Sequence, residues 1–126
     1  MKNLSKMLVV SFAALCVFAI ARSPGVELHA RLTGTGHGEA EWKTQDHGTR
    51  LRAKLDVSGE HLAASSNFTV TIGNNAPFTV TTDNSGEFES EQRFNSATRP
   101  TINVGDSVSV ADGTNTIVLS GVFTRH

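Results

Sequence analysis

From residue 26 onward, apolar and polar residues alternate along almost every segment of the chain. Such alternation predicts β-strands that have one buried face and one face in water. Threonines separate Phe68, Val70 and Ile72, and the same FTVT letters return ten residues later with Phe78 and Val80. The repeat therefore predicts the two arms of one hairpin, with Ile72 opposite Phe78 and Val70 opposite Val80.

A second hairpin is predicted within 38–57, where small and apolar residues alternate with charged ones. One register buries the apolar residues and also brings opposite charges together, which stabilises a sheet by about 0.2–1 kcal/mol for each pair. That register places three pairs opposite each other: Trp42 and Leu51, Glu41 and Arg52, and Glu39 and Lys54. Trp42 is expected to point inward.

Four further strands complete the pattern. Segment 87–94 follows a turn at 83–86 and should continue a meander, with Val80 opposite Phe88. The Asp-Gly pair at 112–113 is a strong hairpin signal. It predicts Val108 opposite Leu119 and Val110 opposite Ile117. Segment 27–34 should point Leu28, Ala30 and Leu32 inward.

These segments predict an all-β protein of about eight antiparallel strands, with no helix after the N-terminal leader. The longer links at 58–66 and 95–106 suit a chain that crosses between two packed sheets. A β-sandwich of immunoglobulin-like topology is therefore the expected fold, and a small closed β-barrel is the alternative.

The first 21 residues have the pattern of a secretory signal peptide. Two lysines precede an apolar run that is shorter than the ~20 residues a membrane-spanning helix needs. Cleavage is expected after Ala21, with Ser23 and Ala30 as alternatives. A single domain of 22–126 would then be secreted to the periplasm or the exterior, with no stable membrane anchor.

The exported domain is mildly acidic and free of disulfides. Without Lys2 and Lys6 it has nine basic and twelve acidic residues, a formal net charge of −3. This balance argues against a nucleic-acid partner, which usually requires a strong basic excess. Cys16 is the single cysteine and would leave with the leader. Stability should therefore come from packed apolar surface.

Several clusters suggest ion binding, and each has a simpler structural explanation. Arg50, Arg52 and Lys54 form a basic stripe, but the expected charge ladder pairs two of them. The five histidines are at least eight residues apart, which argues against convergent metal ligands: His29, His37, His47, His61 and His126. No metal site or cofactor is predicted.

Two loop motifs also favour structural roles. The oxygen-rich segment from Asp83 to Glu87 resembles the start of a calcium loop, yet it is too short for the full pattern. Turn formation is favoured, although weak calcium binding stays open. The glycines at 34, 36 and 38 lack the residues of a phosphate-binding loop, and they are expected to provide flexibility or close backbone approach.

No catalytic constellation is evident. The sequence has no nucleophile elbow and no cysteine beyond the leader. The carboxylates that could act in glycoside cleavage fall on expected wet faces, where their pKa values would stay ordinary: Glu39, Glu41, Glu87, Glu89 and Glu91. One tryptophan and no tyrosine make an aromatic sugar platform improbable. The protein is therefore expected to be no enzyme, with no catalytic residue assigned.

Three segments carry a family resemblance: LTGTGHGEAEW at 32–42, TTDNSGEF at 81–88 and PTINVGD at 100–106. The chain thereby resembles small exported bacterial β-sandwich proteins of undefined role. The resemblance implies an immunoglobulin-like topology and assigns no binding or catalytic residue, since its motifs consist of turn and core positions.

The resulting functional expectation is a non-catalytic protein of the cell envelope or exterior that acts through protein contact. Unpaired backbone groups at a sheet edge could accept a partner strand or a second copy, and the expected edges are 27–34 and 116–123. The alternative is a module for a small ligand, a carbohydrate or a metal, which would use the loops at 58–67 and 95–106.

Overall fold

The computed structural model describes residues 25–47 and 50–126. The expected signal peptide, the cleavage positions at Ala21 and Ser23, and Cys16 lie outside the described residues. The alternative cleavage position at Ala30 is described: it is a buried residue within the strand Glu27–Gly34. The described part of the chain contains no helix long and apolar enough to cross a membrane.

The described residues form nine β-strands and no helix, which confirms the all-β prediction. The strands are β1 (Glu27–Gly34), β2 (His37–His47), β3 (Arg50–Glu60), β4 (Asn67–Ile72), β5 (Phe78–Thr81), β6 (Phe88–Phe94), β7 (Ser107–Ala111), β8 (Ile117–Val122) and β9 (Thr124–Arg125).

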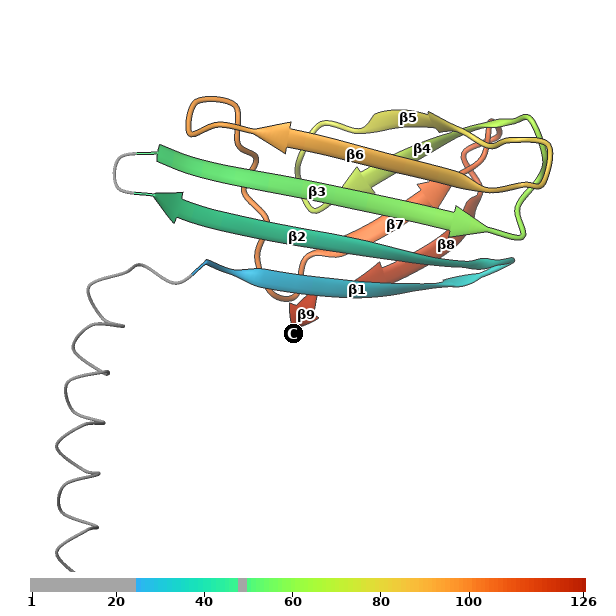
Figure 1. The fold of residues 1–126 in the computed structure, drawn as a ribbon. Coiled ribbons are helices and arrows are strands. Elements are labelled where there is room, and N and C mark those ends of the chain that lie inside the picture. The colour runs from blue at the N-terminus through green and yellow to red at the C-terminus, as the bar shows by residue number, and fades with distance from the viewer. Residues whose placement is uncertain (1–24, 48–49) are drawn as a thin grey trace, which may run out of the picture.

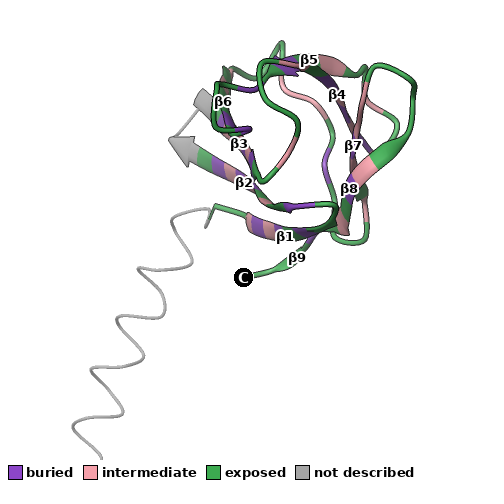
Figure 2. Ribbon diagram, turned by 90° about the vertical axis from the view of Figure 1, so that its right-hand side faces the viewer, coloured by how far each residue is buried: buried purple, intermediate pink, exposed green. Residues whose placement is uncertain are grey.

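All nine strands belong to one antiparallel sheet with the order β5-β4-β7-β8-β1-β2-β3-β6, and β9 pairs with β1. The sheet curls around a shared interior until β5 and β6 approach each other, as the ring of strands in Figure 2 shows. Figure 1 shows the same sheet from the side of β1, β2, β3 and β6. The architecture is thus an antiparallel sheet rolled into a nearly closed barrel, in line with the alternative arrangement predicted from the sequence.

The core consists of the inward residues of each strand, as the alternation predicts. Leu28, Ala30 and Leu32 on β1 are buried, and so is Trp42 on β2. Phe123, between β8 and β9, is the largest fully buried side chain among the described residues. Burial therefore follows the predicted faces along the barrel.

Gly34 and Gly38, on either side of the turn between β1 and β2, allow the backbones of neighbouring strands to approach closely. A side chain at Gly34 would meet the carbonyl of Val118, and one at Gly38 would meet the carbonyl of Ser58. Gly34 also has a φ of 154°. This finding agrees with the predicted use of these glycines.

The predicted register of the second hairpin is wrong by four residues. Trp42 lies opposite Leu55, Glu41 opposite Asp56, and Lys43 opposite Lys54. The strands continue to His47 and Arg50 and leave only two residues between them, the connection length that hairpins prefer. Like charges therefore face each other across these strands, and the expected charge ladder is absent.

The registers of two other hairpins are each wrong by two residues. Val70 lies opposite Phe78. Asn75 N and Asn75 Nδ2 both donate to the Ile72 carbonyl, and this carbonyl therefore bonds to the loop instead of to β5. Val110 lies opposite Leu119, because a bulge follows at Ala111. An even error leaves the side chains of the paired residues on their predicted faces. Ile117 is the exception: it was expected to point inward opposite Val110, but it follows the bulge opposite Ala111 and is 60% exposed.

The predicted meander and the predicted edges are also wrong. β5 and β6 are the two ends of the sheet and are not paired, so Val80 does not face Phe88. β1 lies between β2 and β8, and β8 lies between β1 and β7. The two expected edge segments are therefore internal, and the true edges are β5 and β6.

We expect Phe123→Ala to lower the free energy of unfolding by about 3–5 kcal/mol, because it removes a fully buried ring and leaves a cavity. Urea denaturation would measure the loss. Val122→Ala is the control, since Val122 is 50% exposed and should cost less than about 0.5 kcal/mol. Equal losses for the two variants would contradict this placement of the core.

Candidate functional site

The outer face of β1 carries the first two residues of a cluster of donor atoms. Leu28 and Ala30 point into the barrel, so Glu27 and His29 point outward beside each other. The Nε2 atom of His29 lies 3.3 Å from Oε1 of Glu27. The alternation that builds the core therefore also places an imidazole next to a carboxylate.

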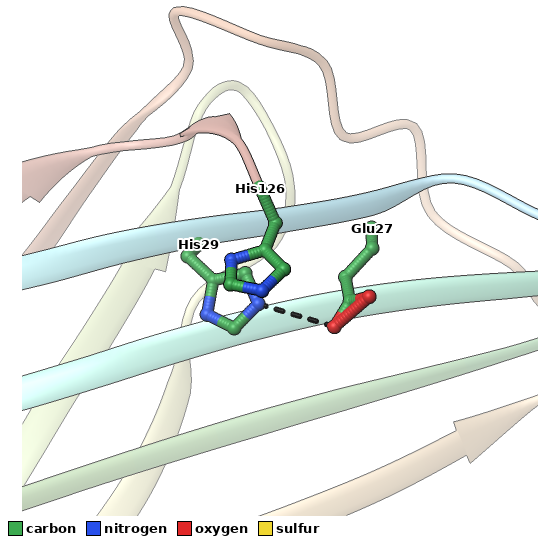
Figure 3. Close-up of side chains that lie close together, drawn as sticks. All are labelled: Glu27, His29 and His126. Carbon is green, nitrogen blue, oxygen red and sulfur yellow. Dashed lines mark hydrogen bonds and ion pairs between the residues drawn. The ribbon is translucent and has the colours of Figure 1, made fainter.

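β9 brings a second imidazole to the same place. Leu28 lies opposite Arg125 and His29 opposite Thr124. The backbone N–H of His126 donates to the Glu27 carbonyl at 3.2 Å, which sets His126 across from Glu27. The centroids of the His29 and His126 rings are 4.2 Å apart with an interplanar angle of 33° (Figure 3).

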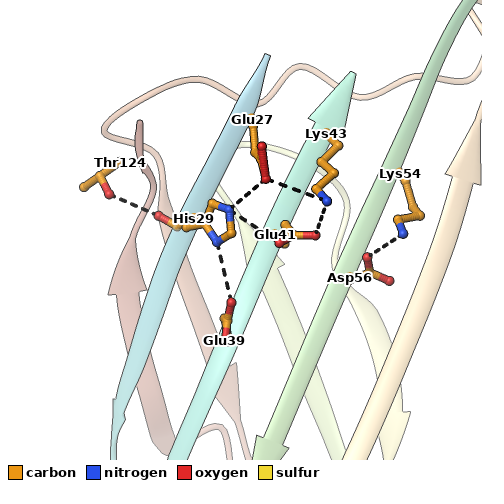
Figure 4. Close-up of polar contacts among 8 residues, drawn as sticks. All are labelled: Glu27, His29, Glu39, Glu41, Lys43, Lys54, Asp56 and Thr124. Atoms are coloured by element: carbon orange, nitrogen blue, oxygen red, sulfur yellow. Dashed lines mark hydrogen bonds and ion pairs between the residues drawn. The ribbon is translucent and has the colours of Figure 1, made fainter. Parts of the chain in front are cut away.

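Two carboxylates of β2 approach His29 from the other side. Glu41 lies directly opposite His29, and its Oε2 is 3.4 Å from Nε2. Oε1 of Glu39 is 3.5 Å from Nδ1. Figure 4 shows both ring nitrogens of His29 directed toward carboxylates. The His29 side chain is 23% exposed, so this cluster is partly shielded from water.

Lys43 is the cation of the cluster. Its Nζ lies 3.2 Å from Oε1 of Glu41 and 3.7 Å from Oε1 of Glu27 (Figure 4). The ammonium group bridges the two carboxylates closest to the imidazole. It therefore occupies the region that an added cation would have to share.

Hydrogen bonding and charge shift two pKa values in this cluster. The hydrogen bond with His29 is the main cause that lowers the pKa of Glu27, and the charge of Lys43 adds to it. The hydrogen bond with Glu41 is the main cause that raises the pKa of Lys43, followed by the charges of Glu41 and Glu27. Both shifts stabilise the charged forms of these groups.

The donor atoms fall into two triads that share His29: Glu27, His29 and His126, and His29, Glu39 and Glu41. Within each triad the donor atoms lie within 4.8 Å of one another. Tetrahedral zinc with ligands at 2.0–2.1 Å needs donors about 3.3 Å apart, so small side-chain rotations would be enough. We call the six side chains, including Lys43, the His29 cluster.

The formal charge of the His29 cluster favours a divalent cation. Three carboxylates and one ammonium give −2 when both imidazoles are neutral, the state in which imidazole binds metals. Glu39 also lies opposite Arg31, which reduces its share of that charge. The triad of Glu27 and the two histidines is the better metal site, because it offers two nitrogen donors.

The basic stripe predicted from the sequence is built differently from expectation. Lys54 bonds to Asp56 on its own strand, at 3.3 Å between Nζ and Oδ2. Arg52 and Lys54 line a surface groove of about 590 Å³ together with Lys43 and Arg93. The Arg50 side chain lies outside the described residues. Carboxylates compensate Lys43, Lys54 and Arg93, which gives little support to an anion site.

The other predicted candidates lie apart from the His29 cluster. His37 and His61 meet edge to face with ring centroids 5.6 Å apart, and the His47 side chain lies outside the described residues. A groove of about 480 Å³ beside them contains Glu39, Glu87 and Glu89. Within the described part of the chain, the two triads around His29 are the groups whose spacing suits a metal.

Asp83 forms the turn that its sequence predicts. Its Oδ1 accepts the backbone N–H groups of Ser85 at 2.9 Å and of Glu87 at 3.0 Å. Asn84 accepts a hydrogen bond from the Ser65 hydroxyl. Oδ1 of Asp83 and Oδ1 of Asn84 are thus engaged by the protein itself, which disfavours a calcium site there.

Sequence reasoning missed the His29 cluster because it compared only the histidines with one another. Glu27 and His29 lie two residues apart on a predicted strand, and this spacing was the available signal. His126 is 97 residues from His29, and only the pairing of β9 with β1 brings the two together. The histidine spacing therefore did not exclude convergence.

We expect Glu27→Gln to reduce the loss of stability in acid. The pKa of Glu27 is lowered from 4.5 in the folded protein, so its contribution is present above pH 4.5 and is lost as pH falls through the folded value. Thermal unfolding at several pH values between about 3 and 7 would show a shallower acid decline. Glu89→Gln, outside the cluster, should keep the original slope, and a parallel decline in all three proteins would contradict the prediction.

Comparison with known proteins adds no assignment. No protein-family model matches the chain, and no curated protein matches it. The function of the His29 cluster therefore has to follow from its own donor atoms and charges.

Proposed function

We propose that the protein is an exported, non-catalytic binding domain that takes up a divalent transition-metal ion at Glu27, His29 and His126. The observation that carries the proposal is the convergence of two imidazoles and a carboxylate from β1 and the β9 end, with donor atoms within 4.8 Å of one another. The apolar leader pattern supports export to the periplasm or the exterior.

The donor set favours zinc or copper over calcium or magnesium. Imidazole nitrogen suits Zn²⁺, Cu²⁺ and Ni²⁺, whereas Ca²⁺ and Mg²⁺ prefer oxygen ligands. Two nitrogens and one carboxylate oxygen form a known type of zinc ligand set. Oε1 of Glu39 lies 3.5 Å from Nδ1 of His29 and can hold the imidazole ring in place by a hydrogen bond when Nε2 binds the metal, as carboxylates beside metal ligands do.

The surroundings of the cluster favour binding over catalysis. The two grooves of about 590 and 480 Å³ each contain one member of the cluster, Lys43 and Glu39 respectively, but neither contains a residue of the triad Glu27, His29 and His126. His126 is exposed, and His29 retains 23% of its side-chain surface. A metal held there would lie on an open convex sheet, without the enclosed pocket that substrates generally occupy.

We expect the untagged full chain to be stabilised by Zn²⁺ or Cu²⁺ and not by Ca²⁺ or Mg²⁺. A ligand that binds only the native state raises the melting temperature, and the rise increases with the logarithm of the free ligand concentration above Kd. Isothermal titration calorimetry should give one ion for each chain. His29→Ala and His126→Ala should each weaken binding by at least about tenfold, because each removes a nitrogen ligand.

His61→Ala is the matched control, since it removes an imidazole that lies beside His37 and belongs to neither triad. Its affinity for the metal should equal that of the unaltered chain. The proposal would be wrong if neither Zn²⁺ nor Cu²⁺ bound, or if all three histidine variants lost the same affinity.

Lys43→Gln provides a test in the opposite direction. Lys43 bridges Glu27 and Glu41, so its removal should free both carboxylates and strengthen metal binding severalfold. A purely structural ion network would instead lose stability without any gain in metal affinity. Calorimetry of this variant, together with its melting temperature in the absence of metal, separates the two cases.

Protein interaction, the function expected from the sequence, is the second candidate. It is favoured by the edge strand β6, which ends the sheet and pairs with β3 alone among the described strands.

A further inference from the structure

The outer face of β2, β3 and β6 sorts its charges into two rows that cross the strands. Lys43, Lys54 and Arg93 lie side by side in the basic row. At the next outward-facing position of each strand, two residues away, Glu41, Asp56 and Glu91 form the acidic row. The cations and anions thus alternate along each strand and are segregated across the sheet.

This arrangement is unfavourable between strands. Like charges directly opposite each other destabilise a sheet, and both rows consist of such contacts. Pairs along the strands compensate in part, with 3.2 Å between Lys43 and Glu41, and 2.9 Å between Arg93 Nε and Glu91 Oε2. Exposed pairs of this kind contribute little, however, so the row pattern calls for a further explanation.

Both rows end at the edge strand β6. Arg93 and Glu91 each have a like charge on the β3 side and no strand on the other side among the described residues. In Figure 1 the C-terminal end of β6 extends beyond β5, the strand at the other end of the sheet. No described strand pairs with the outer side of β6, and at its C-terminal end, beyond β5 (Figure 1), its backbone groups can accept another strand.

We propose that two copies of this chain associate through antiparallel pairing of their β6 strands, centred on Gln92. In this register Arg93 of each copy lies opposite Glu91 of the other. The two copies are then related by a two-fold axis at Gln92. The basic row of the first copy continues into the acidic row of the second, and the acidic row of the first continues into the basic row of the second. The pairing goes beyond the metal site and does not depend on it.

Charge selects this register over its neighbours. A pairing centred on Glu91 would place the two Glu91 carboxylates opposite each other, which is repulsive. A shift by one residue would bring inward-facing side chains opposite outward-facing ones. Centring on Gln92 avoids both faults and sets the half-buried Phe94 opposite Ser90 of the second copy, on the inner face.

Charge reversal on β6 tests the pairing. Size-exclusion chromatography with light scattering should show a concentration-dependent dimer for the full chain. Arg93→Glu and Glu91→Arg should each weaken the dimer by at least tenfold, because like charges then meet in both pairs. The double variant that carries both changes restores opposite pairs and should dimerise again.

Mixing the two single variants gives the most specific readout. Arg93→Glu supplies two carboxylates and Glu91→Arg supplies two guanidinium groups, so an equimolar mixture should form a heterodimer that neither forms alone. Arg52→Glu, an exposed charge reversal on β3, should leave the dimer intact. Strictly monomeric behaviour at every concentration, dimers unaffected by the β6 reversals, or a mixture that stays monomeric would each overturn the proposal.

Discussion

The structure depends on one constraint, which is that every strand buries alternate side chains in a single shared interior. Because the sheet curls into a nearly closed barrel, all inward positions meet the same core, and Phe123 fills it where β8 ends. The outward positions are then fixed as well. Glu27, His29 and the charged rows of β2, β3 and β6 occupy one outer surface because their neighbours in the chain are buried.

The sequence predicted the faces of the strands much better than their partners. Trp42 and Leu28 are buried as expected, because period-two alternation states directly which side chains avoid water. The partner of Trp42 was misplaced by four residues, because an even shift changes neither face. The opposite charges that favoured the wrong register pair along strands instead, as Lys54 does with Asp56.

The candidate site was predictable only in part. Strand 27–34 and its inward residues were recognised, so the outward positions of Glu27 and His29 followed from the sequence. His126 could not be placed, because its position depends on a long-range pairing of β9 that leaves no local signal. The edge role of β6 was likewise hidden, since it depends on the order of strands in the closed sheet.

Because Phe123 separates β8 from β9, the two strands need not detach from β1 at the same time. β8 pairs with Thr33 and Gly34, whereas the two residues of β9 pair with Leu28 and His29, so these two contacts with β1 can open separately. A pairing of only two residues opens far more often than a barrel unfolds. An ion shared by β1 and His126 would hold this segment closed and slow the exchange of the His126 amide, which donates to the Glu27 carbonyl, while the remaining strands keep their own rates.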